Sequence, residues 1–235
     1  MHRNKIEIVE PFEGDCITLV NANLNKGVHQ FLDIARKMPQ QKFLAVLPYY
    51  GELNVPPAPG NVEWVKFDDD IRTILKRTRI LLVPSYYESF GRIEVEAMLN
   101  RIPVLYSKPT KNSVYPGGST EGLDEWIRPT GIAVERDNID DWVHAIESLD
   151  SEDVYTERAN QSREHIEAMN LFTEASRIAD FIESFARRNP VVLRLQQPST
   201  PAQAMKEGPP RVREPPPGPR PGGFGFSNGR LRIQR

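Results

Sequence analysis

The residues with the clearest chemical potential lie between Pro84 and Met98. This stretch reads Pro-Ser-Tyr-Tyr-Glu-Ser-Phe-Gly-Arg-Ile-Glu-Val-Glu-Ala-Met and follows an apolar run typical of a buried strand. We expect Glu88 in a loop, Ser89 as an N-cap, and a helix over 90–99. Free amides and the dipole at a helix N-terminus bind phosphate oxygens, and Gly91 lets the backbone approach a ligand. The stretch therefore predicts an anion site.

Two further carboxylates follow within the expected helix, at Glu94 and Glu96. Because a helix turns about 100° per residue, these two side chains leave it on nearly opposite faces, and at most one can face the site. A carboxylate accepts hydrogen bonds from paired hydroxyls, as in folds that bind ribose. Taken singly, Glu88 is better explained as an exposed loop acid and Glu96 as a solvated helix acid; the spacing between them is what favours a functional role.

Strand and helix patterns alternate along the first 190 residues. We expect strands at 16–20, 42–47, 61–66, 79–83, 103–106 and 131–134. We expect helices at 26–37, 69–77, 90–99, 122–127, 139–149, 153–169 and 172–187. This alternation predicts the α/β class, with a single Rossmann-like parallel sheet of about six strands and helices on both faces. Ligands of such sheets bind at the carboxyl ends of the strands, where the predicted anion site falls.

The chain divides by composition into three parts. Residues 1–15 form a lead-in, residues 16–190 a Rossmann-like domain, and residues 191–235 a Pro/Gly/Arg-rich tail. Nine prolines lie between residues 198 and 221, with almost no aliphatic side chains to bury, so we expect the tail to be disordered. The tail is also basic, which would suit an SH3-like domain or an acidic surface; a solvated linker is the simpler alternative.

Composition excludes several other classes of function. The net charge of −2, with both signs mixed along the chain, gives no basic field for nucleic acid. Cys16 is the single cysteine, and we expect it in the core. The sequence lacks a signal peptide and any apolar run long enough to cross a bilayer, so a cytoplasmic location is expected. We expect no metal site: the histidines share no motif, and the acids at 68–70 suit a helix start.

The 84–98 stretch resembles the signature of the family-4-type retaining glycosyltransferases, which have the GT-B fold. Their pattern is Pro-Ser-x-x-Glu-x-Phe-Gly, four residues, then Glu-Ala-Met, and every fixed position is present here. Residues 19–27 resemble the first loop of that family, which ends in Lys-Gly at a helix start. In all, residues 17–168 resemble the C-terminal, donor-binding half of a GT-B fold.

The resemblance implies a role for each matched residue. Lys26 would contact the donor diphosphate, and Glu96 the nucleoside ribose. Glu88 would hold hydroxyls of the transferred sugar, with the amides near Phe90 and Gly91 on the phosphates. The expected donor-binding residues are Asn23, Lys26, Glu88, Phe90, Gly91 and Glu96, with Glu88 and Lys26 carrying catalysis. A lysine and helix amides can stabilise a leaving diphosphate without a metal, so we expect no cofactor beyond a UDP- or GDP-sugar donor.

Two departures from the family pattern leave alternatives open. The first loop has no arginine before Lys26, so a second cation comes from elsewhere or the diphosphate is neutralised less fully. The first strand begins at about residue 16, so an acceptor-binding domain is absent or supplied in trans, by a separate domain or chain. The alternatives to a glycosyltransferase are a non-catalytic nucleotide-sugar-binding module and, less favoured by the motif, a sugar-nucleotide epimerase.

Overall fold

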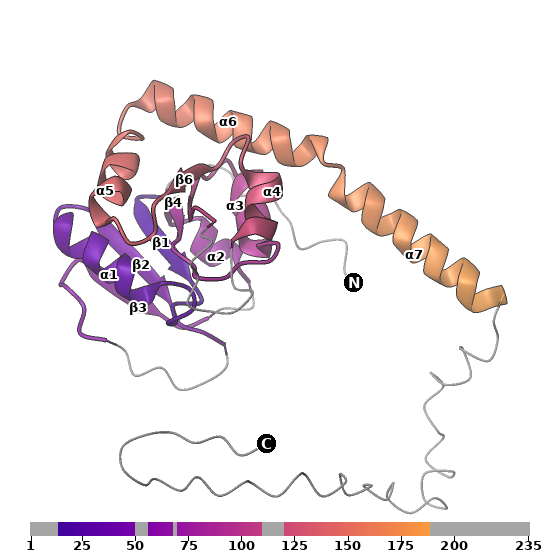
Figure 1. Cartoon of the computed structure of the whole chain (residues 1–235), viewed down its shortest axis with the longest axis horizontal. Coiled ribbons are helices and arrows are strands. Elements are labelled where there is room, and N and C mark those ends of the chain that lie inside the picture. The colour runs from indigo at the N-terminus through magenta and orange to yellow at the C-terminus, as the bar shows by residue number, and fades with distance from the viewer. Residues whose placement is uncertain (1–13, 50–55, 68–69, 110–119, 189–235) are drawn as a thin grey trace, which may run out of the picture. The chain divides into compact units, whose positions relative to one another are not determined.

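The computed structural model describes residues 14–49, 56–67, 70–109 and 120–188, and strands alternate with helices through them (Figure 1). The strands are β1 (Cys16–Val20), β2 (Lys42–Val46), β3 (Val62–Val65), β4 (Thr78–Val83), β5 (Val104–Ser107) and β6 (Ile132–Val134). The helices are α1 (Val28–Lys37), α2 (Arg72–Leu75), α3 (Arg92–Leu99), α4 (Glu121–Ile127), α5 (Ile139–Glu147), α6 (Glu152–Ala168) and α7 (Leu171–Arg188). The predicted tail, residues 191–235, and residues 1–13 of the lead-in lie outside the described residues.

The strands form one six-stranded sheet in the order β3-β2-β1-β4-β5-β6, and every neighbouring pair is parallel. The predicted fold class is therefore confirmed. The chain moves outward from β1 to β3 and then returns to the other side of β1 to build β4. The strand order thus reverses between β1 and β4, and this is the position where doubly wound sheets bind their ligands.

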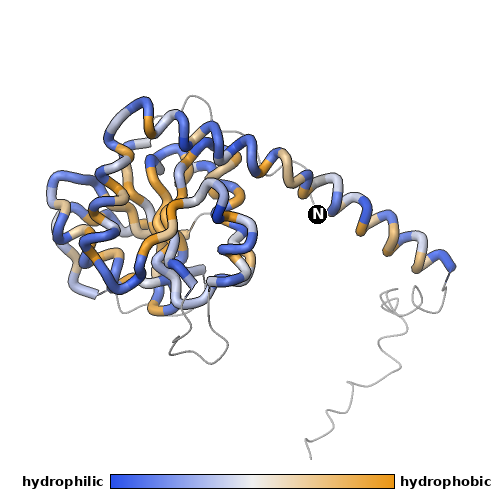
Figure 2. Tube along the Cα trace, turned by 45° about the horizontal axis from the view of Figure 1, so that its top comes forward, coloured by the Kyte–Doolittle hydropathy of each residue, from blue (hydrophilic) through white to orange (hydrophobic). Residues whose placement is uncertain are grey.

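Alternate side chains of the strands enter two hydrophobic layers. Ile17 and Leu19 of β1 pack with α1 and α5 on one face of the sheet. Leu81 and Val83 of β4 pack on the other face with α3 and α4. Figure 2 shows hydrophobic residues concentrated along the strands and hydrophilic residues on the outer sides of the surrounding helices. The sheet is therefore covered on both faces, which leaves its strand ends as the places where a ligand can reach the backbone.

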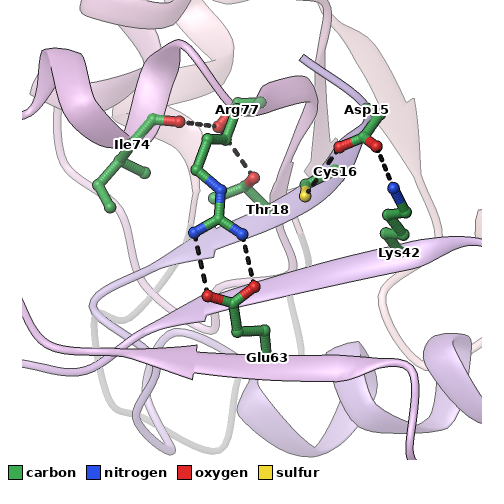
Figure 3. Close-up of polar contacts among 8 residues, drawn as sticks. Asp15, Cys16, Thr18, Lys42, Glu63, Ile74 and Arg77 are labelled. Atoms are coloured by element: carbon green, nitrogen blue, oxygen red, sulfur yellow. Dashed lines mark hydrogen bonds and ion pairs between the residues drawn. The ribbon is translucent and has the colours of Figure 1, made fainter.

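Polar contacts at the amino-terminal edge of the sheet join β1, β2, β3 and the start of β4 (Figure 3). Arg77 donates to Glu63 of β3 at 3.0 Å, and Lys42 of β2 pairs with Asp15. Cys16 is buried beside Asp15, and burial raises the pKa of its thiol to about 11. The thiol is thus a neutral core group, as predicted, and the charges at this edge are engaged with one another.

The contacts within the chain define two units, one ending at Arg177 and one beginning at Ile178, of which the structure describes the helical residues 178–188. The sheet and helices α1–α6 belong to the first unit. Across the described residues, no helix is both long and apolar enough to span a membrane.

Candidate functional site

The loop after β1 is a tight turn built by Asn23. The Asn23 side chain accepts a hydrogen bond from the Lys26 amide at 3.1 Å and donates to the Asn21 side chain at 3.1 Å. Asn21 itself takes a left-handed conformation, with φ at 61°, which asparagine tolerates better than most residues. The turn places Lys26 just before α1, which begins at Val28 instead of at the predicted residue 26. Asn23 thus shapes the loop that presents the lysine.

Gly27 brings this loop into contact with the loop after β4. Its φ is 76°, and a Cβ atom added there would lie 2.1 Å from the carbonyl oxygen of Pro84. Only glycine fits such a position, because both the conformation and the space exclude a side chain. The Tyr86 amide also donates to the Asn25 carbonyl oxygen at 2.9 Å. The two loops that follow the central strands therefore form one packed unit at the switch point.

Within this unit, Lys26 and Glu88 form an ion pair between their Nζ and Oε2 atoms. Their side chains are 25% and 12% exposed, so the pair is partly shielded from water. The structure therefore brings together the two residues predicted to carry the chemistry, which are 62 positions apart in the sequence. The lysine already holds an anionic oxygen, so a phosphate oxygen could replace the carboxylate at the same ammonium group.

The helix after this loop begins differently from the prediction. Gly91, with φ at 78°, is the N-cap of α3, and the expected N-cap residue Ser89 lies two positions before it. The positive φ ends the loop and turns the chain into the helix. Phe90 is held next to it, because the Trp126 indole donates to its carbonyl oxygen at 2.7 Å and the two rings lie 5.4 Å apart. The amides of the first turn of α3 follow directly from this anchored glycine.

The two carboxylates of α3 occupy different environments. Glu96 pairs with Arg92 at 3.6 Å, and its side chain is 15% exposed. Glu94 is 1% exposed, and neither of its carboxyl oxygens has a hydrogen-bond partner among the described residues. Burial, with a smaller effect of the nearby Glu88 carboxylate, raises the pKa of Glu94 to about 7. The expected divergence of the two side chains is confirmed, whereas the burial of Glu94 was not foreseen.

A second side of the site comes from the residues after β6. The guanidinium of Arg136 lies 3.9 Å from the centroid of the Tyr86 ring and pairs with Asp137. Gln30 of α1 donates to the Tyr86 hydroxyl at 3.2 Å and to Asp137 at 3.3 Å. The sequence analysis did not identify Gln30 or Arg136 as residues of the site. The signal for Arg136 was its place directly after a predicted strand.

Arg136 and Asp137 also line a polar hollow at the carboxyl ends of β5 and β6. Its volume is about 450 Å³, and it is lined by Lys108, Glu135, Arg136, Asp137 and Asn138. Arg136 therefore takes part in both places: its guanidinium contacts the Tyr86 ring, and the same residue lines the hollow. This gives the carboxyl edge a cation beyond Lys26, from a strand distant from the first loop.

No group of three or more His, Cys, Asp or Glu side chains that could hold a metal occurs within residues 14–49, 56–67, 70–109 and 120–188. Of the three aspartates at 68–70, the first two lie outside the described residues. Asp70 pairs with Arg72, and the hydrogen bond from that guanidinium lowers the pKa of Asp70 to about 2. Asp70 therefore acts at the start of α2, as expected of an acid at a helix start.

Comparison with known proteins gives a match to the part of the chain that holds β4, α3 and the loop between them. Residues 57–168, which include the whole 84–98 stretch, match the family described as glycosyl transferases group 1. This segment is similar to the group 1 glycosyltransferases. A D-inositol 3-phosphate glycosyltransferase from Corynebacterium kroppenstedtii is 27% identical over 125 residues, which are 53% of this chain and 26% of that protein.

Solved structures of glycosyltransferases share the fold. Sucrose-phosphate synthase from Thermosynechococcus elongatus has a TM-score of 0.58 at 18% identity, over 76% of this chain and 47% of that one. Anabaena HepE, crystallised with UDP-glucose, has a TM-score of 0.59 at 19% identity, over 73% and 49%. The C-terminal domain of the group 1 glycosyl transferase LpcC from Francisella tularensis has a TM-score of 0.53 at 14% identity, over 70% and 95%.

The fraction of each similar protein that this chain spans shows which part of those proteins it resembles. The chain spans about a quarter of the inositol-phosphate enzyme and about half of the two longer solved structures, but it spans nearly all of the isolated C-terminal domain. The described residues therefore share the fold of a C-terminal glycosyltransferase domain, and the match over residues 57–168 supports the resemblance to the group 1 family.

Proposed function

We propose that this chain binds the nucleotide-sugar donor of a retaining glycosyltransferase, at a donor site formed by the packed loops after β1 and β4. The observation that carries the proposal is the Lys26–Glu88 ion pair at the switch point of the sheet. It places one cation and one hydroxyl-binding carboxylate side by side, next to the N-terminus of α3. This is the combination needed for a ligand that joins a diphosphate to a sugar.

The proposed roles follow the charge that develops in the reaction. The bond between the anomeric carbon and the diphosphate oxygen breaks, and the leaving diphosphate keeps the electron pair. Lys26 and the amides of the first turn of α3 would stabilise that negative charge from fixed positions. Glu88, released from the lysine by the incoming phosphate, would accept hydrogen bonds from sugar hydroxyls. Asn23 would hold the lysine loop, and Glu96 would accept from the ribose.

The acceptor side of the reaction is part of the same proposal. An acceptor hydroxyl would form the new bond at the anomeric carbon and lose its proton, with the configuration of that carbon retained. The acceptor would be presented by a further domain or chain. We propose a UDP- or GDP-sugar as the donor, a metal-independent reaction and a cytoplasmic location. The crystal structure of HepE with UDP-glucose supports a uridine donor by similarity of fold.

The experiment that tests this function is calorimetric titration of the purified chain with UDP-glucose, GDP-mannose and ADP-glucose, followed by product analysis. Binding of at least one of them, with competition by the matching nucleoside diphosphate, is the expected result. Hydrolysis or transfer with retention, read by NMR of the anomeric proton, would identify an enzyme. Donor binding without turnover, with every acceptor tried, would instead favour the non-catalytic binding module. Absence of binding by all three would refute a donor site.

Replacing Glu96 with glutamine is expected to weaken donor binding about tenfold. A hydrogen bond to a charged group contributes about 1.5–3 kcal/mol, and the amide keeps the shape of the side chain while removing the charge. The measurement is the dissociation constant for the tightest-binding nucleotide sugar. Glu157→Gln on the exposed side of α6 is the matched control and should leave affinity unchanged. Equal affinities for Glu96→Gln and the wild type would remove Glu96 from the ribose site.

A further inference from the structure

Glu94 is a buried acid that the proposed roles leave unused. It lies in the first turn of α3, immediately beside the N-cap: a Cβ atom on Gly91 would approach its Oε2 atom to 2.5 Å. Its carboxyl oxygens have no hydrogen-bond partner among the described residues, and the side chain is almost fully buried. An ionised carboxylate is costly in such a place, because burial removes the water that would otherwise solvate it.

The groups around Glu94 make its ionisation less favourable still. Glu88 from the loop after β4 and Glu96 from α3 both repel a charge on Glu94, whereas the backbone amide of Glu94 and, more weakly, Lys26 from the loop after β1 favour one. That lysine is already paired with Glu88.

On the side of α4, Leu123 faces Gly91 and carries no charge, while Asp124 is engaged with Arg128 and Tyr106. On α6, Ile166 belongs to the core shared with α3, and His165 bonds the Trp126 carbonyl oxygen.

A donor diphosphate would add negative charge to this same corner. In the proposed function, phosphate oxygens take the place of the Glu88 carboxylate on Lys26 and lie against the first amides of α3. With Glu94 ionised, Lys26 and the helix amides would face two protein carboxylates as well as the diphosphate. With Glu94 neutral, one of those carboxylate charges is gone, and the field of the helix N-terminus acts on the ligand alone.

We propose that Glu94 is a positioning residue of the donor site and must hold a proton for an anionic donor to bind, so that binding takes up a proton. This rests on the proposed function, because it assigns Glu94 a part in the same site. Glu94 acts without contacting the donor: its neutral form leaves Lys26 and the α3 amides free to meet the phosphates. Donor affinity should therefore be highest below pH 7 and should fall as Glu94 ionises.

The test is the pH dependence of nucleotide-sugar binding in the wild type, Glu94→Gln and Glu94→Leu. A nucleotide sugar is a diphosphate diester whose charge is constant between pH 6 and 8, so any change over that interval comes from the protein. We expect the affinity of the wild type for the tightest-binding probe among UDP-glucose, GDP-mannose and ADP-glucose to fall about tenfold between pH 6 and pH 8. Both neutral variants should bind with an affinity that is nearly independent of pH.

A second readout follows the proton itself. The carboxyl carbon of Glu94, assigned by its loss in Glu94→Gln, should titrate near neutral pH in the free chain and at least one pH unit higher with the probe bound. In the absence of any donor, the folded state keeps the proton that the unfolded state loses above about pH 4.5. The thermal midpoint of the wild type should therefore fall relative to that of Glu94→Gln as the pH rises from 5 to 8.

The outcomes separate this inference from the function on which it rests. Donor binding that falls with pH equally in the wild type, Glu94→Gln and Glu94→Leu would overturn the role of Glu94 and leave the donor site standing. Donor binding that is independent of pH in the wild type would also overturn the role of Glu94 without contradicting the donor site. Failure of all three nucleotide sugars to bind at any pH would overturn both, whatever the titration of the free Glu94. Glu157→Gln should follow the wild type throughout.

Discussion

Replacing Gly27 with alanine should lower the free energy of unfolding by about 3–4 kcal/mol and abolish measurable donor binding. The added Cβ would meet the Pro84 carbonyl oxygen at 2.1 Å, and the φ of 76° is one that alanine adopts only with strain. The two nearest atoms, the carbonyl oxygen and carbon of Pro84, are backbone, so the clash can be relieved only by separating the two loops that form the site. Denaturant unfolding and nucleotide-sugar titration of the same sample measure the two effects.

The matched control for this change is Gly60→Ala. An added Cβ at Gly60 meets nothing within 4 Å, so stability should change by less than about 1 kcal/mol, and donor affinity should stay the same. If Gly27→Ala proved as stable as Gly60→Ala and bound donor normally, the close packing of the loops after β1 and β4 would be wrong, and with it the geometry assigned to Lys26.

Replacing Lys26 with methionine should weaken nucleotide-sugar binding about 100-fold. The substitution keeps the length of the aliphatic chain but removes the charge proposed to meet the diphosphate. Hydrogen bonds to charged groups contribute about 1.5–3 kcal/mol each, and about 1.4 kcal/mol corresponds to a factor of ten. Glu88 would also lose its partner while only 12% exposed, which adds an unneutralised negative charge to the site. The dissociation constant, measured by calorimetry at two salt concentrations, checks the prediction.

Lys42→Met provides a control at the opposite edge of the sheet. Lys42 also forms an ion pair with a carboxylate, that of Asp15, but it lies at the start of β2, away from the proposed donor site. Its replacement should leave donor affinity within a factor of two, and the salt dependence of binding should weaken only for Lys26→Met. Equal losses in the two variants would mean that Lys26 acts through the stability of the domain and makes no contact with the donor.

The strands and helices could be predicted closely because the sheet is buried on both faces. Most of its strands are short apolar runs, and helices with one apolar side follow most of them. Family resemblance then supplied Lys26 and Glu88, and the strand order explains why they meet: β1 and β4 are neighbours although 57 residues separate Val20 from Thr78. That order is a property of long-range pairing, which periodicity alone does not reveal.

The residues that sequence reasoning missed share a physical cause. Glu94 is an acid on the buried side of a short helix, where the usual pattern of burial predicts an apolar residue. Arg136 reaches Tyr86 only because β6 and β4 lie on the same side of β1, with β5 between them. Ser89 was wrongly predicted as an N-cap, because the left-handed conformation that starts α3 falls on Gly91. Each case depends on tertiary contacts that local preference does not encode.

The most direct test of the proposed donor site is amide chemical-shift mapping of the isotope-labelled chain during titration with UDP-glucose, GDP-mannose and ADP-glucose. The predicted result is a saturable set of shifts centred on Lys26 and Gly27 and on the loop from Tyr86 to Gly91, for at least one of the three. Shifts confined to the amino-terminal edge around Cys16 and Arg77, or no saturable shifts with any nucleotide sugar, would contradict a donor site at the switch point of this sheet.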